Sequence, residues 1–172
     1  MERILEDLLR SLEESNSTYI LTGAILMQFY GEPRATGDID VIVEQKNMQT
    51  LGARLKENGF IFSELVPGHN TLLHRESNLR IDLIIRESIG EEVTIIEVEG
   101  KRIRASTAEN LILKKLEWMG DEYTWRDATD TVSIFIRMGN NLNIEYLFEE
   151  SRKRGLFQRL RNLLAKYDLV FD

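Results

Sequence analysis

The sequence contains no cysteine and no long apolar run. Without thiols the chain can form neither a disulfide nor a zinc-thiolate site. No stretch approaches the roughly 20 apolar residues that a membrane-spanning helix needs. The N-terminal segment MERILEDLLRSLEE is charged throughout, unlike a secretory signal. We therefore expect a cytoplasmic protein that has no membrane partner.

Positive charge is also scarce. The 172 residues include 22 Lys and Arg against 29 Asp and Glu, a net charge of −7. An acidic molecule of this kind is not expected to bind nucleic acid through its overall field. The one dense basic cluster lies near the C-terminus and consists of Arg152, Lys153, Arg154, Arg159 and Arg161. It has no interleaved exposed aromatics, which favours a solvated surface over an RNA-binding site.

Two acidic residues stand out in the run DIDVIV, which begins at Asp38. In a strand, alternate side chains share a face, so Ile39, Val41 and Val43 enter a core while Asp38 and Asp40 share the other face. The two carboxylates are then about 7 Å apart along the strand. They repel each other unless a cation lies between them, and oxygen ligands favour Mg²⁺ or Mn²⁺. The pattern predicts a divalent-metal site.

The segment before these acids predicts an anion site. A buried strand, Tyr19–Leu21, leads to Gly23, then to a short helix, Ala24–Tyr30, and to a loop that contains Arg34 and Thr36. Amides at such a strand-to-helix junction can receive a phosphate. The alternative is that Gly23 only lets the backbone turn and that Arg34 is a solvent-exposed loop arginine.

A third carboxylate, Asp82, lies in the apolar run LRIDLII. Ile81, Leu83 and Ile85 take one face of this predicted strand, so Asp82 lies on the other face together with Arg80. Burying a carboxylate without a partner is costly. Asp82 is therefore either a third metal ligand or an aspartate that faces water or Arg80.

A lysine interrupts the apolar stripe of the helix that follows Ser106. Ser106 and Glu109 have capping-box spacing, and Lys115 falls at the centre of the stripe, whereas Lys114 points elsewhere. A lysine in a packed stripe must extend to solvent or meet an anion, so Lys115 is a candidate binding residue and Lys114 the fallback. The stripe consists of Ala108, Leu111, Ile112, Leu116 and Met119.

The next predicted helix, about Glu122–Met138, carries Asp127 at the border of its apolar stripe. Asp127 is expected to orient Lys115 or a metal-bound water, and a purely structural Lys–Asp pair fits equally well. The buried side is expected to contain Trp125, Ala128, Val132, Phe135 and Ile136, and the solvated side Arg126, Asp130, Ser133 and Arg137.

The whole pattern predicts an α+β fold, with a small mixed sheet flanked by helices and followed by C-terminal helices. Residues 1–104 are expected to form the core and residues 105–172 a helical part of the same compact domain. His69 and His74 lack a partner at metal-ligand spacing and are interpreted as incidental. The remaining predicted helices are Glu2–Glu14, Asn47–Asn58, Ile144–Arg152 and Leu156–Tyr167. The predicted strands are Phe60–Val66, Thr71–Arg75, Leu79–Arg86, Glu91–Glu99 and Lys101–Arg104, with a hairpin turn at residues 76–78.

The order of a strand, Gly plus a small residue, a helix, a loop and Asp-hydrophobic-Asp resembles the signature of the DNA polymerase β-like nucleotidyltransferase superfamily. The segment G…YGEPRATGDIDVIV is most similar to the small minimal bacterial and archaeal branch of this superfamily, which includes toxin–antitoxin nucleotidyltransferases. The resemblance implies that the turn at Gly23 and Ala24 grips a nucleoside triphosphate. It also implies that Asp38 and Asp40, completed by Asp82, are catalytic and hold two metals, Mg²⁺ or Mn²⁺.

The resemblance extends into the helical half. Lys115, directly before a leucine, is similar to the lysine that contacts nucleotide phosphate in minimal nucleotidyltransferases, and the segment around Asp127 resembles the arginine–aspartate element that follows it. Together with Gly23 and Ala24, the expected nucleotide-binding residues are Arg34, Thr36, Lys115 and Asp127.

The function implied is transfer of a nucleoside monophosphate from a nucleoside triphosphate to an acceptor, which is RNA, a protein or a small molecule. A homodimer or a cognate partner protein is the expected assembly. A second hypothesis is a catalytically inactive nucleotide-binding or regulatory protein, favoured because Ala24 stands where the family has Gly or Ser. A third is an interaction module with an acidic surface.

Overall fold

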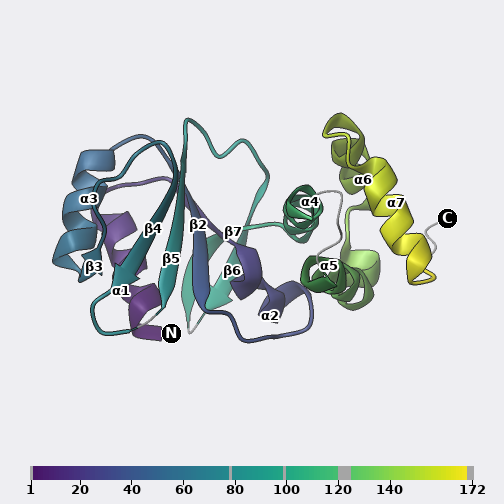
Figure 1. Cartoon of the computed structure of the whole chain (residues 1–172), viewed down its shortest axis with the longest axis horizontal. Helices are drawn as coiled ribbons and strands as arrows, with labels where there is room; N and C mark the ends of the chain where they lie inside the picture. Colours follow the sequence, from purple (N-terminus) through teal and green to yellow (C-terminus); the bar gives the residue numbers. More distant parts are fainter. Residues whose placement is uncertain (1, 78, 99, 120–124, 170–172) are drawn as a thin grey trace. The chain divides into compact units, whose positions relative to one another are not determined.

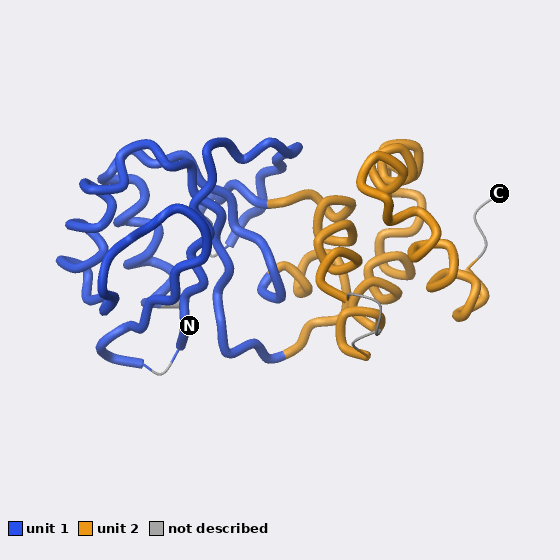
Figure 2. The backbone as a smooth tube through the Cα atoms, turned by 45° about the horizontal axis from the view of Figure 1, so that its top comes forward, with its two compact units in different colours: residues 1–25, 35–105 blue, residues 26–34, 106–172 orange. Residues whose placement is uncertain are grey.

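A computed structural model describes residues 2–77, 79–98, 100–119 and 125–169. The chain divides into two compact units (Figure 2). The first consists of residues 1–25 and 35–105, and the second of residues 26–34 and 106–172. The segment 26–34 therefore belongs with the C-terminal helices, although it lies in the middle of the first half of the sequence. The expectation that both parts form one compact domain stays a prediction.

Seven strands of the described chain form one mixed sheet, in the order β3-β4-β5-β2-β1-β7-β6 (Figure 1). Strand β2 is antiparallel to β1 and parallel to β5, and β4 is antiparallel to β5. The predicted α+β fold with a mixed sheet is confirmed. The strands are β1 (Tyr19–Thr22), β2 (Asp38–Glu44), β3 (Phe60–Ile61), β4 (Gly68–His74), β5 (Arg80–Arg86), β6 (Val93–Val98) and β7 (Lys101–Ser106).

The first unit buries apolar side chains on both faces of this sheet, since Ile42 packs with Ile20 and Ile89 on the face opposite Val41 and Val43. Helices α1 (Glu2–Glu14) and α3 (Met48–Glu57) lie together beside the β4 end of the sheet (Figure 1). Leu8 and Leu12 of α1, one helical turn apart, are fully buried. The alternation predicted for β2 is confirmed, since Ile39, Val41 and Val43 are buried while the aspartates between them are partly exposed.

The predicted strand Phe60–Val66 is wrong beyond its second residue. β3 pairs with β4 only through Phe60 and Ile61. Further along, the side chain of Asn70 accepts a hydrogen bond from the backbone N–H of Val66 and donates one to its carbonyl, at 2.9 and 2.8 Å. A side chain thus satisfies the backbone groups that a longer strand would pair. The β4–β5 hairpin is confirmed, and residue 78 of its predicted turn lies outside the described residues.

The second unit is helical. Its helices are α2 (Met27–Tyr30), α4 (Ala108–Trp118), α5 (Trp125–Met138), α6 (Ile144–Lys153) and α7 (Phe157–Lys166). The short helix predicted over Ala24–Tyr30 is in fact a 3₁₀ turn, Gly23–Leu26, followed by α2. None of the helices in the described parts of the chain is long and apolar enough to cross a membrane.

The predicted capping box of α4 is wrong. Ser106 is the last residue of β7, and Thr107 is the N-cap, whose hydroxyl accepts a hydrogen bond from the backbone N–H of Asn110 at 3.2 Å. Glu109 instead accepts from the backbone N–H of Asn143 at 2.7 Å. All five residues of the predicted apolar stripe are buried, but helix α4 is buried from Ala108 to Leu116 without a break, so the burial is not confined to one stripe.

Helix α5 is turned relative to the prediction. Ala128, Val132 and Phe135 are buried as expected, but Trp125 is 78% exposed and Ile136 is 66% exposed. Asp130, expected on the solvated side, is only 5% exposed. The helix buries Asp130 because cationic side chains of the same unit receive its carboxylate there, as described below. The predicted residues 122–124 lie outside the described range.

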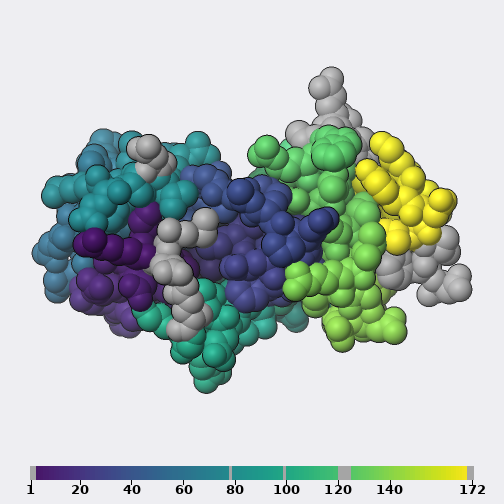
Figure 3. Space-filling view, turned by 90° about the horizontal axis from the view of Figure 1, so that it is seen from below, coloured from purple at the N-terminus to yellow at the C-terminus, as the bar shows by residue number. Residues whose placement is uncertain are grey.

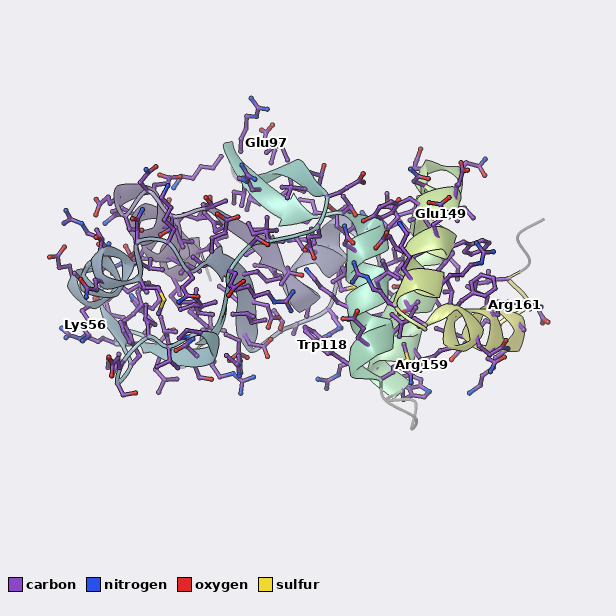
Figure 4. All side chains as sticks on the ribbon, turned by 90° about the horizontal axis from the view of Figure 1, so that it is seen from above. Lys56, Glu97, Trp118, Glu149, Arg159 and Arg161 are labelled. Atoms are coloured by element: carbon purple, nitrogen blue, oxygen red, sulfur yellow. The ribbon has the colours of Figure 1, made fainter. Side chains whose placement is uncertain are left out.

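The basic cluster near the C-terminus is largely engaged within the second unit. Figure 3 shows α7, in yellow, against the green segment that contains α5 and α6. Arg159, labelled in Figure 4, donates a hydrogen bond to the carbonyl of Leu116 at 2.6 Å. Arg154 pairs with Glu117 at 3.2 Å, and Arg152 lies 4.3 Å from the ring centroid of Phe157. These contacts support the interpretation of a structural surface rather than an RNA-binding one.

Candidate functional site

Four polar residues form a row across four neighbouring strands, on the face of the sheet that also carries the buried Ile20 and Ile42. In the observed register Thr22 is opposite Asp40, Asp40 is opposite Asp82, and Asp82 is opposite Thr71. Adjacent strands are about 5 Å apart, so the two carboxylates are direct neighbours. Asp38 lies on the same face, two residues before Asp40. The predicted sharing of one face by the three aspartates is what this register produces.

Gly23 brings the backbone against one of these carboxylates. Its φ is +73°, and a Cβ atom placed there would lie 1.8 Å from Oδ2 of Asp40. Both the left-handed conformation and the close approach require glycine. The turn between β1 and the 3₁₀ segment therefore passes directly beside Asp40. Ala24 follows as the second residue of that segment.

Asp82 is nearly buried and its oxygens are satisfied by three neighbours. Its side chain is 8% exposed. Oδ1 accepts a hydrogen bond from Thr71 Oγ1 at 3.1 Å and lies 3.1 Å from His69 Nε2. Oδ2 lies 2.9 Å from Arg80 Nη2. His69, which no spacing in the sequence singles out, therefore contacts one of the three candidate aspartates.

Asp38 is held by a threonine and by the same arginine. Thr36 Oγ1 donates to Asp38 Oδ1 at 2.6 Å, so Thr36 orients a carboxylate. Arg80 Nη2 donates to Asp38 Oδ2 at 3.1 Å. One nitrogen of Arg80 therefore links Asp38 and Asp82.

The donor chemistry of this face fits a hard divalent cation, since it consists of carboxylate oxygens on rigid strands beside a glycine turn. Within the described parts of the chain, however, no three His, Cys, Asp or Glu side chains are grouped so that they could hold a metal ion. The guanidinium of Arg80 lies at the oxygens that such an ion would use. The metal role of the three aspartates stays a prediction.

In the second unit, the buried amine of Lys115 is paired with two carboxylates. It is 3% exposed, and its Nζ lies 2.6 Å from Asp130 Oδ2 and 3.3 Å from Asp127 Oδ1. The predicted Lys115–Asp127 contact is therefore present, but Asp130 is the closer partner. Lys114, also buried, donates to Ser106 Oγ at 2.8 Å. The expectation that Lys115 faces the three aspartates stays a prediction.

Asp130 also binds Arg34. The Nε atom of Arg34 lies 3.1 Å from Oδ1 and its Nη2 atom 3.0 Å from Oδ2, a two-pronged contact. Burial raises the pKa of the Asp130 carboxyl, but the hydrogen bonds and charges of Arg34 and Lys115 lower it more, so that the pKa lies below its ordinary 3.8. The helical spacing of Asp127 and Asp130, three residues apart, is the signal that sequence reasoning missed.

Comparison with solved structures shows which known proteins share the fold of this chain. No family model and no curated protein matches the chain. Among solved structures, ANT(2'')-Ia in complex with adenylyl-2''-tobramycin has a TM-score of 0.65 and 15% identity, over 88% of this chain and 96% of that one. The lincosamide antibiotic adenylyltransferase LnuA, lincomycin-bound, has a TM-score of 0.59 and 18% identity, over 78% and 96%. The fold is that of nucleotidyltransferases.

A third nucleotidyltransferase-like structure shares this fold. It is an antigenic protein from Paracoccidioides brasiliensis, with a TM-score of 0.55 and 14% identity over 95% of this chain and 91% of that one. The nucleotidyltransferase fold accords with the superfamily resemblance of the sequence. The finer assignment to the small toxin–antitoxin type stays a prediction.

Proposed function

We propose that this chain transfers a nucleoside monophosphate from a nucleoside triphosphate to a hydroxyl group of a small molecule. The observation that carries the proposal is the pairing of Asp40 with Asp82 across β2 and β5, with the backbone of Gly23 against Asp40. It sets two carboxylates on one face of the sheet, with a glycine turn directly beside one of them. The fold adds support, since its solved neighbours include adenylyltransferases.

The reaction is an in-line displacement at the α-phosphorus. The acceptor oxygen forms a new bond to phosphorus, the bond from the α-phosphorus to the bridging oxygen breaks, and pyrophosphate leaves with that electron pair. The proton of the hydroxyl passes to a carboxylate of the same face. No oxidant or reductant is needed.

Asp38, Asp40 and Asp82 are the residues that would hold Mg²⁺ or Mn²⁺. When bound, the ions would neutralise charge on the leaving pyrophosphate and lower the pKa of the acceptor hydroxyl. The chain's own contribution is to fix the carboxylates: Thr36 orients Asp38 by a 2.6 Å hydrogen bond, and Thr71 orients Asp82 by one of 3.1 Å. Fixed ligands require little reorganisation during the reaction.

The residues proposed to contact the nucleotide are Gly23, Ala24, Arg34, Lys115 and Asp127. The Gly23–Ala24 turn offers backbone N–H groups to the triphosphate. Arg34 and Lys115 are the cations proposed for the phosphates, and both are oriented by the Asp130 carboxylate, with Asp127 as a further partner of Lys115. Arginine and lysine both suit phosphate, the first as a fork and the second as a compact charge.

A small-molecule acceptor is preferred over RNA for three reasons. ANT(2'')-Ia was crystallised with adenylyl-2''-tobramycin and LnuA with lincomycin, and the present chain spans 96% of the length of each. The basic cluster near its own C-terminus is engaged in contacts inside the second unit. The acidic net charge of −7 also favours a cationic or neutral acceptor.

The test is turnover with a matched pair of variants. Purified protein with Mg²⁺ or Mn²⁺ is given each of the four ribonucleoside triphosphates and a panel of polyhydroxylated antibiotics, and pyrophosphate release and the mass of the acceptor are measured. Asp40→Asn is expected to abolish both signals. Glu44→Gln, which removes a carboxylate from the far end of the same strand β2, is expected to keep them. Turnover by Asp40→Asn equal to that of the wild type would refute the proposed site.

A second candidate function is nucleotide binding without turnover. The observation that favours it is Ala24, which lacks the hydroxyl that a serine would offer to a phosphate after Gly23. Metal-dependent nucleotide binding with no pyrophosphate release from any acceptor would establish this alternative.

A further inference from the structure

Arg80 lies where the proposed metal chemistry needs a cation. Its Nη2 atom is 3.1 Å from Asp38 Oδ2 and 2.9 Å from Asp82 Oδ2, so one nitrogen joins the two carboxylates. The register explains the geometry, because Arg80 is opposite Asp38 and precedes Asp82 by two residues on the same face of β5. The guanidinium thereby compensates two negative charges that would otherwise repel each other.

Arg80 and a divalent ion compete for these oxygens. Mg²⁺ binds carboxylate oxygen at about 2.0–2.1 Å, which would put it within a few ångströms of a guanidinium that contacts the same atoms. Two cations at that separation repel each other, and water screens the repulsion least beside Asp82, which is only 8% exposed. The Arg80 side chain is itself half exposed, so it has room to turn away.

A nucleoside triphosphate offers Arg80 a second anion. The planar fork of an arginine matches phosphate as well as carboxylate. We propose that Arg80 is the resident counter-cation of the carboxylate face, that it moves from Asp38 and Asp82 to the triphosphate, and that it thereby couples metal binding to nucleotide binding. This inference rests on the proposed function and adds to it that the metal binds weakly alone and tightly with nucleotide.

Such coupling is reciprocal and measurable. If nucleotide raises metal affinity by some factor, metal raises nucleotide affinity by the same factor. The probe is Mn²⁺, whose free concentration is followed by electron paramagnetic resonance, with and without a saturating α,β-methylene analogue of ATP. The wild type is expected to bind Mn²⁺ about tenfold more tightly with the analogue, a ratio that corresponds to about 1.4 kcal/mol.

The matched variants are Arg80→Gln and Arg86→Gln. Both remove one positive charge from the same face of β5, about 20 Å apart. Arg80→Gln is expected to bind Mn²⁺ alone about tenfold more tightly than the wild type and to lose most of the enhancement by the analogue. Arg86→Gln is expected to behave as the wild type. Circular dichroism in chelator checks that each variant is folded.

The possible outcomes distinguish failure of the role proposed for Arg80 from failure of the proposed nucleotidyltransferase function. If Arg80→Gln binds Mn²⁺ alone no more tightly than the wild type, or if the analogue enhances Mn²⁺ binding equally in both, the counter-cation role is refuted while the nucleotidyltransferase site stands. If neither protein binds Mn²⁺ with or without the analogue, both proposals fall. Tighter Mn²⁺ binding by Arg80→Gln, together with no enhancement by the analogue in the wild type, would support displacement of Arg80 from the carboxylates and overturn its transfer to a triphosphate.

Discussion

The buried carboxylate of Asp130 offers the sharpest test of the second unit. The substitution Asp130→Asn keeps the shape of the side chain and removes its charge. The carboxylate has two cationic partners, Lys115 at 2.6 Å and Arg34 at 3.0 Å. Lys115 is the more vulnerable of the two, because it is 3% exposed and water cannot replace its lost partner.

The magnitude follows from the geometry. Removing one member of a buried ion pair costs about 3–5 kcal/mol, and Lys115 keeps a weaker contact with Asp127 at 3.3 Å, so the lower end applies. We expect Asp130→Asn to lower the free energy of unfolding by about 3 kcal/mol, which for a chain of this length is a fall in Tm of about 6–12 °C. Asp127→Asn, whose wild-type side chain is 22% exposed, is the matched control and is expected to cost about 1 kcal/mol.

The assay is urea unfolding followed by circular dichroism over a range of pH. The pKa of Asp130 is below 3.8 in the folded chain, so its charge contributes fully above the unfolded value near 4. This contribution is lost as the pH falls through the lower folded value. The gap between the wild type and Asp130→Asn is therefore expected to be constant at neutral pH and to shrink below pH 4. A cost smaller than that of Asp127→Asn, or a gap that widens in acid, would contradict the reasoning.

Three further predictions concern single substitutions, at Gly23, Tyr30 and Asp40. Gly23→Ala should lower the free energy of unfolding by at least about 1–2 kcal/mol in urea titrations, because the new Cβ meets Asp40 Oδ2 and φ is +73°. Tyr30→Phe should cost about 1 kcal/mol at neutral pH, since the hydroxyl donates to the Ser106 carbonyl at 2.9 Å. Burial raises the pKa of Tyr30 to about 12, so the wild type should lose about 3 kcal/mol of stability relative to this variant between pH 10 and 12, as measured by alkaline denaturation. Asp40→Asn should melt in chelator at or above the wild-type Tm but gain no stability from Mg²⁺ with nucleotide, and a much lower Tm would assign Asp40 a structural role.

Local patterns predicted the carboxylate face because each strand alternates by itself. The faces of Asp38 and Asp82 follow from two residues of sequence on either side. The contact of His69 with Asp82 does not, because it depends on hairpin register. In the observed pairing Thr71 is opposite Asp82, and a shift of one residue would place Leu72 there and turn His69 to the other face. The predicted turn at residues 76–78 did not fix that register.

The burial of Asp130 was missed for a different reason. The buried side of a helix is predicted from the positions of its apolar residues. Because Trp125 and Ile136 were counted as buried, Asp130 was assigned to the solvated side of α5. In the structure both are exposed, while the carboxylate faces inward. Its partner Arg34 is 96 residues away in the sequence, and no local pattern identifies such a pair. Tertiary ion pairs override the apolar periodicity in this helix.

The assignment of residues 26–34 to the helical unit means that neither unit is one continuous piece of chain. A cut near residue 105 would give a sheet fragment carrying the whole of α2 without the residues it packs on, and a helical fragment in which Asp130 has lost Arg34. Tyr30 would likewise lose the carbonyl of Ser106 that its hydroxyl binds. Tyr30 and Arg34 therefore depend on partners 76 and 96 positions later in the sequence, and any exchange of the helical unit between relatives would have to carry residues 26–34 along with it.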